Sequence, residues 1–169
     1  MNRLLLIAAL LSSSTARAEP AGEVNVLWPF IGISELKVVT PVVAESSSTR
    51  GELVLGTYLD YAQIVRPNAG KAFIIAAIVG YRQFLGHGIH IELAPIIGVR
   101  HEKDHPSDGM TLDDGYVRAF VGVGYQYDVS PQFYVNARAR LGILVYRSSH
   151  WDEEKKLAPG ADVNVGVRF

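Results

Sequence analysis

The sequence predicts an all-β fold, an eight-stranded antiparallel β-barrel. Residues 161–169 alternate between apolar side chains and polar or glycine positions, which is the period of two that defines a strand with one apolar face. Similar alternation recurs earlier in the chain, giving eight segments in all, the even number that closed bacterial barrels have. Several of these segments are longer than the about five or six residues usual for strands.

The expected strands follow one another without a convincing helix between them. The first pair is the least regular, because 31–34 has the composition of a tight turn, and the alternative is that 23–43 forms a single bent strand. In chain order, the eight strands are expected at 23–31, 34–43, 51–61, 71–84, 88–102, 114–128, 131–146 and 160–169.

The amino terminus has the pattern of a cleavable signal peptide. A positively charged start is followed by the apolar run from Leu4 to Leu11, and the small-residue site Ala16-Arg17-Ala18 follows. We expect residues 1–18 to be the signal peptide and 19–169 to be the barrel domain. No later segment approaches the roughly 20 consecutive apolar residues of a membrane helix. An exported chain of this kind either folds in solution or crosses the outer membrane as strands.

The lengths of the connections favour the membrane alternative. Several strands exceed the roughly 9–11 residues that cross a bilayer at a tilt. Short turns at 85–88 and 130–131 are expected on the periplasmic side, and the longer polar connections are expected outside, at 62–70, 103–113 and 147–159. Two connections depart from this asymmetry: 44–50 is long for a periplasmic turn, and the first external turn is too short.

The two faces of the strands also differ in character. In 131–146, every second residue from Phe133 to Val145 is apolar, whereas Arg138 and Arg140 lie on the opposite face. An arginine facing lipid near the bilayer midplane costs roughly 2–4 kcal/mol, so these arginines are expected inside the barrel. A soluble sandwich would reverse the two faces, and alternation alone does not separate the two folds. Strand length, the signal peptide, the terminal Phe169 and the asymmetry of the connections favour the barrel.

The expected interior carries charges of both signs in nearly equal number. The lumen of an eight-stranded barrel is just wide enough for side chains to fill it, and buried charges must be paired. We therefore expect a salt-bridged plug, and the alternative is a narrow, porin-like channel for small solutes. The expected set is seven basic residues, Lys37, Arg82, Arg100, Arg118, Arg138, Arg140 and Arg168, and six acidic residues, Glu35, Glu52, Asp60, Glu92, Glu102 and Asp162.

Aromatic residues gather where a membrane interface is expected. Six of them lie beside the periplasmic turns or at the carboxyl terminus, and such girdles form because amphipathic rings prefer the headgroup level. They are Tyr81, Phe84, Tyr125, Tyr127, Phe133 and Phe169.

No residue is assigned a catalytic, cofactor-binding or metal-binding role. His101 and His105 have a spacing that suits Zn²⁺ on a helix, but they lie in an expected loop beside Pro106. Lipid A deacylases of this size use a His and a Ser two residues apart on one strand. His87 and His90 lack that Ser, and the Ser149-His150 pair is adjacent, so its side chains would point to opposite faces.

Composition removes several further classes of function. The chain has no cysteine, which excludes disulfides, thiolate metal sites and a cysteine nucleophile. Its formal net charge of −1 excludes bulk electrostatic attraction to nucleic acid. We therefore expect no cofactor and no nucleic-acid partner.

Both ends of the chain resemble a known class of protein. The opening Glu23 to Lys37, an apolar strand that reaches a glycine turn and restarts with polar alternation, is similar to the start of small outer-membrane barrels of unknown function. The strand ending in Phe169 resembles the closing strand of the same class. Broadly, the chain looks like a relative of the OmpA/OmpX-type barrel.

This resemblance implies a location and partners, and it leaves the activity open. It implies the outer membrane of a Gram-negative bacterium, contact with outer-membrane lipid, and recognition of the strand ending in Phe169 by the barrel-assembly machinery. We expect a monomer with a non-enzymatic role in the envelope or at the cell surface, carried by exposed loops. The alternatives are a lipid-modifying enzyme and a narrow channel.

Overall fold

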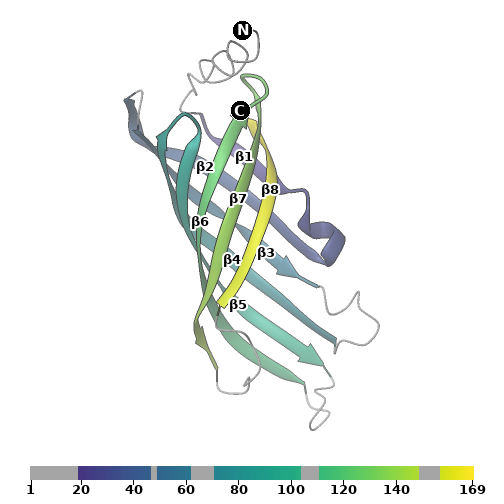
Figure 1. Cartoon of the computed structure of the whole chain (residues 1–169). Coiled ribbons are helices and arrows are strands. Elements are labelled where there is room, and N and C mark those ends of the chain that lie inside the picture. The colour runs from purple at the N-terminus through teal and green to yellow at the C-terminus, as the bar shows by residue number, and fades with distance from the viewer. Residues whose placement is uncertain (1–18, 47–48, 62–70, 104–110, 149–156) are drawn as a thin grey trace.

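The chain folds into one closed antiparallel β-barrel (Figure 1). The computed structural model describes residues 19–46, 49–61, 71–103, 111–148 and 157–169. Its strands are β1 (Ala21–Asn25), β2 (Ile33–Ser46), β3 (Thr49–Asp60), β4 (Lys71–Gly86), β5 (Ile89–Lys103), β6 (Leu112–Asp128), β7 (Phe133–Arg147) and β8 (Leu157–Arg168). The prediction of an eight-stranded antiparallel barrel is confirmed, whereas the expected signal peptide lies outside the described residues.

Pairing between the first and the last strand closes the barrel. β1 runs antiparallel to β8 from Ala21 opposite Arg168 to Asn25 opposite Asn164. Beyond the end of β8, the backbone amide of Phe169 donates a hydrogen bond to the carbonyl oxygen of Pro20 (3.1 Å). Closure satisfies strand edges that would otherwise be open to pairing with another chain.

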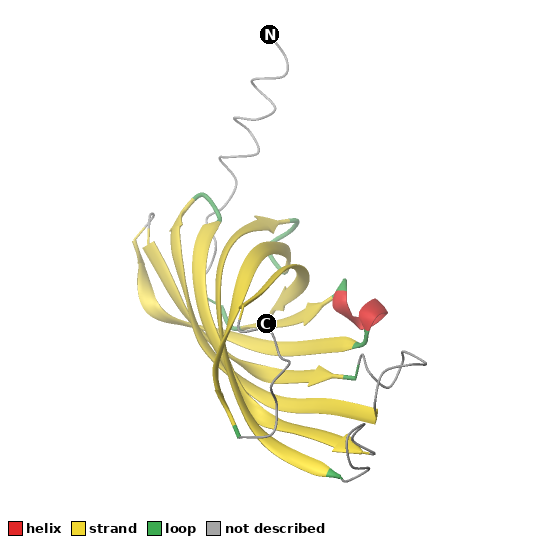
Figure 2. Cartoon of the chain, turned by 60° about the horizontal axis from the view of Figure 1, so that its bottom comes forward, coloured by secondary structure: helices red, strands yellow, loops and turns green. Residues whose placement is uncertain are grey.

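The two ends of the barrel differ in their connections. At one end, called the turn end, β2–β3, β4–β5 and β6–β7 are joined by residues 47–48, 87–88 and 129–132. At the other, called the loop end, the connections are all longer (Figure 2). Both departures expected from the sequence therefore disappear: β2 continues to Ser46, which pairs with Thr49, and the first loop-end connection spans residues 26–32.

The expected first strand was wrong beyond Asn25. Residues Trp28–Ile31 form a 3-10 turn, η1, which separates β1 from β2 and excludes the single bent strand. The side-chain oxygen of Asn25 accepts hydrogen bonds from the backbone amides of Leu27 (3.0 Å) and Trp28 (2.9 Å), so it starts the turn. Gly32, at φ 88°, ends it in a left-handed conformation that favours glycine.

The inward and outward faces are those expected along most of the wall. On β7, the inward positions Tyr134, Asn136, Arg138 and Arg140 are buried, and their neighbours Ala137, Ala139 and Leu141 are exposed. Two residues lie on the opposite face from the one expected. Tyr146 is exposed because a bulge shifts the β6–β7 register between Val117 and Arg118. Phe84, expected in the aromatic girdle, points into the lumen, where the Arg50 guanidinium lies 3.9 Å from its ring centroid.

The lumen is filled by side chains of two kinds. Charged residues occur along its length, including Arg100 and Asp114 near the loop end, and an apolar group, here called the apolar lumen cluster, lies largely nearer the loop end. This cluster comprises Val39, Val54, Tyr58, Ile74, Ala76, Ile78, Ala94, Ile96, Tyr116 and Phe120, with Trp28, Ile33 and Leu144 packed against it. The loop-end rim is uneven, because η1 lies well short of the ends of β5 and β6 (Figure 1).

Candidate functional site

Five basic and five acidic side chains form a continuous network inside the barrel. It draws on seven strands, and the side chains of its members are almost completely buried. We call it the lumen network, and its members are Lys37, Arg50, Arg82, Arg138, Arg140, Glu23, Glu35, Glu52, Glu92 and Asp162. Its signs balance, which is what burial of this many charges requires.

Arg82 on β4 is one centre of the lumen network, and its side chain is fully buried. It donates a bidentate pair of hydrogen bonds to Glu23 on β1 (2.7 and 2.9 Å) and a further bond to Glu92 on β5 (2.8 Å). Its Nη1 also lies 3.2 Å from an oxygen of Glu52 on β3. The Tyr134 hydroxyl on β7 donates to Glu23 as well (2.8 Å). One arginine thus connects opposite parts of the wall.

Two arginines on β7 form the second centre. Arg138 donates to both carboxylate oxygens of Asp162 on β8 (2.8 and 3.0 Å) and to Glu92, which it shares with the first centre. Arg140 donates to Glu35 on β2 (2.7 Å), and its Nε lies 3.2 Å from Asp162. Through the shared Glu92, the ion pairs of the two centres form one continuous set across the lumen.

The remaining strand, β6, contributes space. Its inward-facing Gly122 pairs in register with Arg140, and Gly124 pairs with Arg138. A Cβ atom at Gly124 would lie 2.6 Å from Cγ of Arg138 and 2.5 Å from Nε2 of His90, so no side chain fits there. The glycines of β6 therefore leave room for the arginine side chains of β7.

The structure brings together most of the charged residues predicted for the lumen. Arg100, Arg118 and Arg168 are buried as expected, whereas Asp60 is half-buried and the side chain of Glu102 lies outside the described residues. Sequence reasoning missed three buried charges, Glu23, Arg50 and Asp114. Alternation of Glu23 and Asn25 with valines was the signal that could have placed Glu23 inside.

The described members of the candidate chemical motifs do not assemble into a recognisable site. The Nδ1 atom of His101 lies 2.6 Å from a carboxylate oxygen of Asp113, while His105 and His150 lie outside the described residues. Ser148 donates to Asp114 (2.6 Å) and accepts from the backbone amide of Gly115 (3.0 Å). Within the described parts of the chain, no group of three or more potential metal ligands is present.

Two further findings concern the chain as a whole. Among the described residues, no helix is long and apolar enough to cross a membrane. Comparisons with protein-family models, with curated proteins and with solved structures found no match.

Proposed function

We propose that this chain is a non-enzymatic outer-membrane barrel of the OmpA/OmpX-like type. In this proposal, the lumen network closes the interior, and the connections at the loop end carry an envelope or surface role. The single observation that carries the proposal is the inversion of the faces: the charges are inside and the aliphatic side chains are outside.

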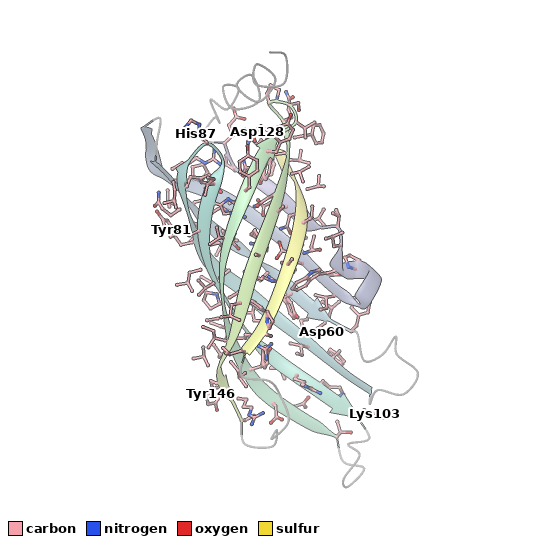
Figure 3. All side chains as sticks on the ribbon, in the orientation of Figure 1. Asp60, Tyr81, His87, Lys103, Asp128 and Tyr146 are labelled. Carbon is pink, nitrogen blue, oxygen red and sulfur yellow. The ribbon has the colours of Figure 1, made fainter. Side chains whose placement is uncertain are left out.

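The outer surface supports placement in lipid. Many large aliphatic side chains point outward and are between 38% and 60% exposed, among them Leu36, Leu55, Ile75, Val79, Leu93, Ile97, Val121, Val123, Leu141 and Ile143. A water-soluble monomer rarely exposes a continuous apolar surface of more than a few hundred Å². Along β5, every outward position from Ile89 to Val99 is apolar, and Lys103 follows at the loop end (Figure 3).

Aromatic rings support the same placement. Five of the six residues expected in a girdle are at least 38% exposed near the turn end, and Figure 3 shows Tyr81 on that side of the molecule, toward His87 and Asp128. Rings of this kind favour the boundary between hydrocarbon and water. The five are Tyr81, Tyr125, Tyr127, Phe133 and Phe169.

The pairing in the lumen favours a plug over a channel. Arg82 and Arg138 share Glu92, and Arg138 and Arg140 share Asp162, so the ion pairs run across the interior without a break. Ions passing through would have to displace pairs whose separation leaves buried charges uncompensated.

A conductance measurement tests the proposal. The purified protein, reconstituted in planar bilayers at neutral pH, should give no steady single-channel current. The double variant Arg138→Ala and Arg140→Ala should leak with a preference for cations, because it removes bulk and leaves three basic members of the lumen network against five acidic ones, with Asp162 deprived of both its arginines. Reproducible ion-selective current from the unmodified protein would make the channel the leading function.

A second measurement tests the membrane placement independently. The mature chain should insert into phospholipid vesicles and migrate as a compact, heat-modifiable band in gel electrophoresis without boiling. A chain that stays monodisperse in buffer without detergent would reject the proposal, because its apolar outer face would then have to be covered by its own packing.

A further inference from the structure

The first connection at the loop end, residues 26–32, lies short of the loop-end rim. The indole nitrogen of Trp28 donates a hydrogen bond to the carbonyl oxygen of Ala161 (2.8 Å), and β8 extends from there to Leu157 at the loop end. The four strand residues beyond Ala161 correspond to about 10 Å along the barrel axis, because the strands are tilted. In Figure 1, η1 accordingly lies well short of the ends of β5 and β6.

The strand register shows how far β1 lies below β5. Residues that lie directly opposite one another form a row that runs once around the barrel. In order, its members are Ile97 on β5, Ala77, Thr57, Leu36, Val24 on β1, Val165, Val135 and Tyr127 on β6. Tyr127 is two residues nearer the turn end than Tyr125, the partner of Ile89, so one circuit descends by about ten residues toward the turn end. Val24 lies halfway around this circuit.

This descent places η1 within the apolar band of the outer surface. Half of the circuit is about five residues of tilted strand, or about 12 Å along the barrel axis. Val26 is two residues beyond Val24, as Val99 is beyond Ile97, so Val26 lies about 12 Å short of Val99, the last apolar outward position on β5. The apolar band of a membrane barrel is about 25 Å tall, which puts Val26 near its middle. η1 has four residues with a rise of about 2 Å each, so it ends inside the band.

The composition of this connection agrees with its depth. Residues 26–34 include no charged residue, and Leu27 (49%) and Pro29 are exposed. At the rim itself the outer face is polar, because Lys103 is exposed at the end of β5 and Asp113 is exposed on β6. The connection is thus apolar where it is deep, and the wall becomes polar only where it is high.

Most backbone donors of the connection are satisfied within the protein, which a segment surrounded by hydrocarbon requires. The Val26 amide donates to the carbonyl oxygen of Val163 (2.9 Å), and the Gly32 amide donates to that of Pro29 (3.2 Å). The amides of Leu27 and Trp28 both donate to the Asn25 side chain. Pro29 has no amide proton to satisfy.

The indole of Trp28 covers Arg140, a cation of the lumen network. The ring centroid lies 3.7 Å from the guanidinium carbon, and the Arg140 side chain is only 6% exposed. An arginine that faces hydrocarbon destabilises a membrane barrel. A ring over Arg140 therefore suits a wall whose outer side, at this point, lies in lipid.

We propose that the connection 26–32 is embedded in the hydrocarbon of the outer leaflet, where acyl chains contact Leu27 and Pro29. Its surface continues that of the exposed Val24 and Leu36 on the neighbouring strands. A leaflet thinned to this level would instead place headgroups on Leu27 and Pro29, which offer them no polar side chain. This inference rests on the proposed function, which places the barrel in the membrane, and it removes the first connection from those that could carry a surface role.

Spin labels measure the depth of the connection directly. The chain has no cysteine, so Leu27→Cys, Leu93→Cys and Asp113→Cys each provide a single labelling site. Each labelled chain is folded into dioleoylphosphatidylcholine vesicles. Collisions of the nitroxide with oxygen, which concentrates in hydrocarbon, are compared with collisions with a water-soluble nickel complex. We expect the oxygen-to-nickel ratio at Leu27 to be close to that at Leu93, in the middle of the apolar face of β5, and several-fold above that at Asp113.

Two arginine variants form a matched pair. Leu27 and Leu157 are similarly exposed (49% and 55%), but Leu157 lies at the loop end of β8. The cost of a charge on the lipid face falls from the bilayer midplane toward the interface. Leu27→Arg should therefore lower the equilibrium constant for folding into vesicles by about tenfold or more, and Leu157→Arg should change it by less than about threefold. If Leu27→Arg gives no heat-modifiable barrel, Leu27→Gln takes its place with a smaller expected loss.

Three results would overturn the inference. The first is an oxygen-to-nickel ratio at Leu27 as low as that at Asp113, which places the connection at the headgroups or in water. The second is a low collision rate with both reagents at Leu27, which assigns the connection to contact with a second copy of the chain. The third is an equal effect of the two arginine variants. A high ratio at Leu93 with any of these rejects the embedded connection alone, whereas a low ratio at Leu93 rejects the membrane placement and the proposed function with it.

Discussion

Replacing Arg82 by methionine should strongly destabilise the barrel. Its guanidinium pairs with three buried carboxylates, of which Glu52 and Glu92 each keep a second arginine when Arg82 is removed. Among the described residues, Glu23 has no other cation within ion-pair distance and would retain only the hydroxyl of Tyr134. The substitution therefore leaves one uncompensated buried charge, not three.

The expected loss of folding free energy in Arg82→Met comes from the single carboxylate of Glu23. Removing one partner of a buried ion pair costs about 3–5 kcal/mol, chiefly through the charge that remains. Arg82→Met combined with Glu23→Gln removes that charge and keeps an acceptor for Tyr134, so most of the lost stability should return. Balance is restored as well, because the lumen network then holds four basic and four acidic members in place of five of each.

Urea titration in vesicles, followed by the heat-modifiable band, measures the free energy of unfolding for each variant. Arg50→Met is the matched control, because its partner Glu52 keeps Arg82 and the loss should be clearly smaller. A double variant as unstable as Arg82→Met alone would refute the reasoning. It would mean that Arg82 acts through its packing and not through the carboxylate it neutralises.

Three further predictions concern assembly, faces and packing. Deleting Phe169 should lower the yield of heat-modifiable barrel in outer-membrane fractions, because its amide helps to close the first strand against the last; an unchanged yield would count against this role. Leu141→Arg should impair folding into vesicles more than Arg140→Leu, by roughly 2–4 kcal/mol for a charge in hydrocarbon, and the reverse order would mean that the faces are assigned inside out. Gly166→Ala should destabilise the barrel in the same urea titration, because its Cβ atom would overlap the ring of Tyr134; wild-type stability would show that the ring moves aside freely.

The strands were predictable from the sequence because their period is simple. Seven of the eight were placed within a few residues. Alternation put Arg138 and Arg140 on one face of their strand, and strand length, the signal-peptide pattern, the terminal Phe169 and the asymmetry of the connections assigned that face to the lumen, where both side chains are buried. The expected first strand was wrong near Trp28, because the Asn25 side chain binds the backbone amides of Leu27 and Trp28 and so competes with strand pairing. A bulge between β6 and β7 turns Tyr146 outward. A bulge inserts one extra residue, and the alternation of residue types in the sequence does not reveal where this happens.

The partners within the lumen could not be predicted in the same way. Alternation puts Arg82 on the face that was assigned to the interior, but which carboxylates it meets depends on the tilt and stagger of strands around the closed barrel. Glu23 and Arg82 lie on strands that are not neighbours, and no local pattern connects them. The early end of β1 at Asn25 was equally hidden, because the sequence led us to extend this strand to residue 31.

The long reach of the lumen network bears on the order in which the barrel forms. Tyr134 and Glu23 are 111 residues apart in the sequence, and Arg140 and Glu35 are 105 apart. These hydrogen bonds of the first two strands can therefore form only after β7 has been added. Until then, Glu23 and Glu35 each lack a bond that they have in the finished barrel. Contacts between distant segments slow folding, since chain closure comes before the gain in interaction energy. Formation of the interior should thus be a late, concerted event, and a chain stopped before β7 should be trapped as an unclosed intermediate.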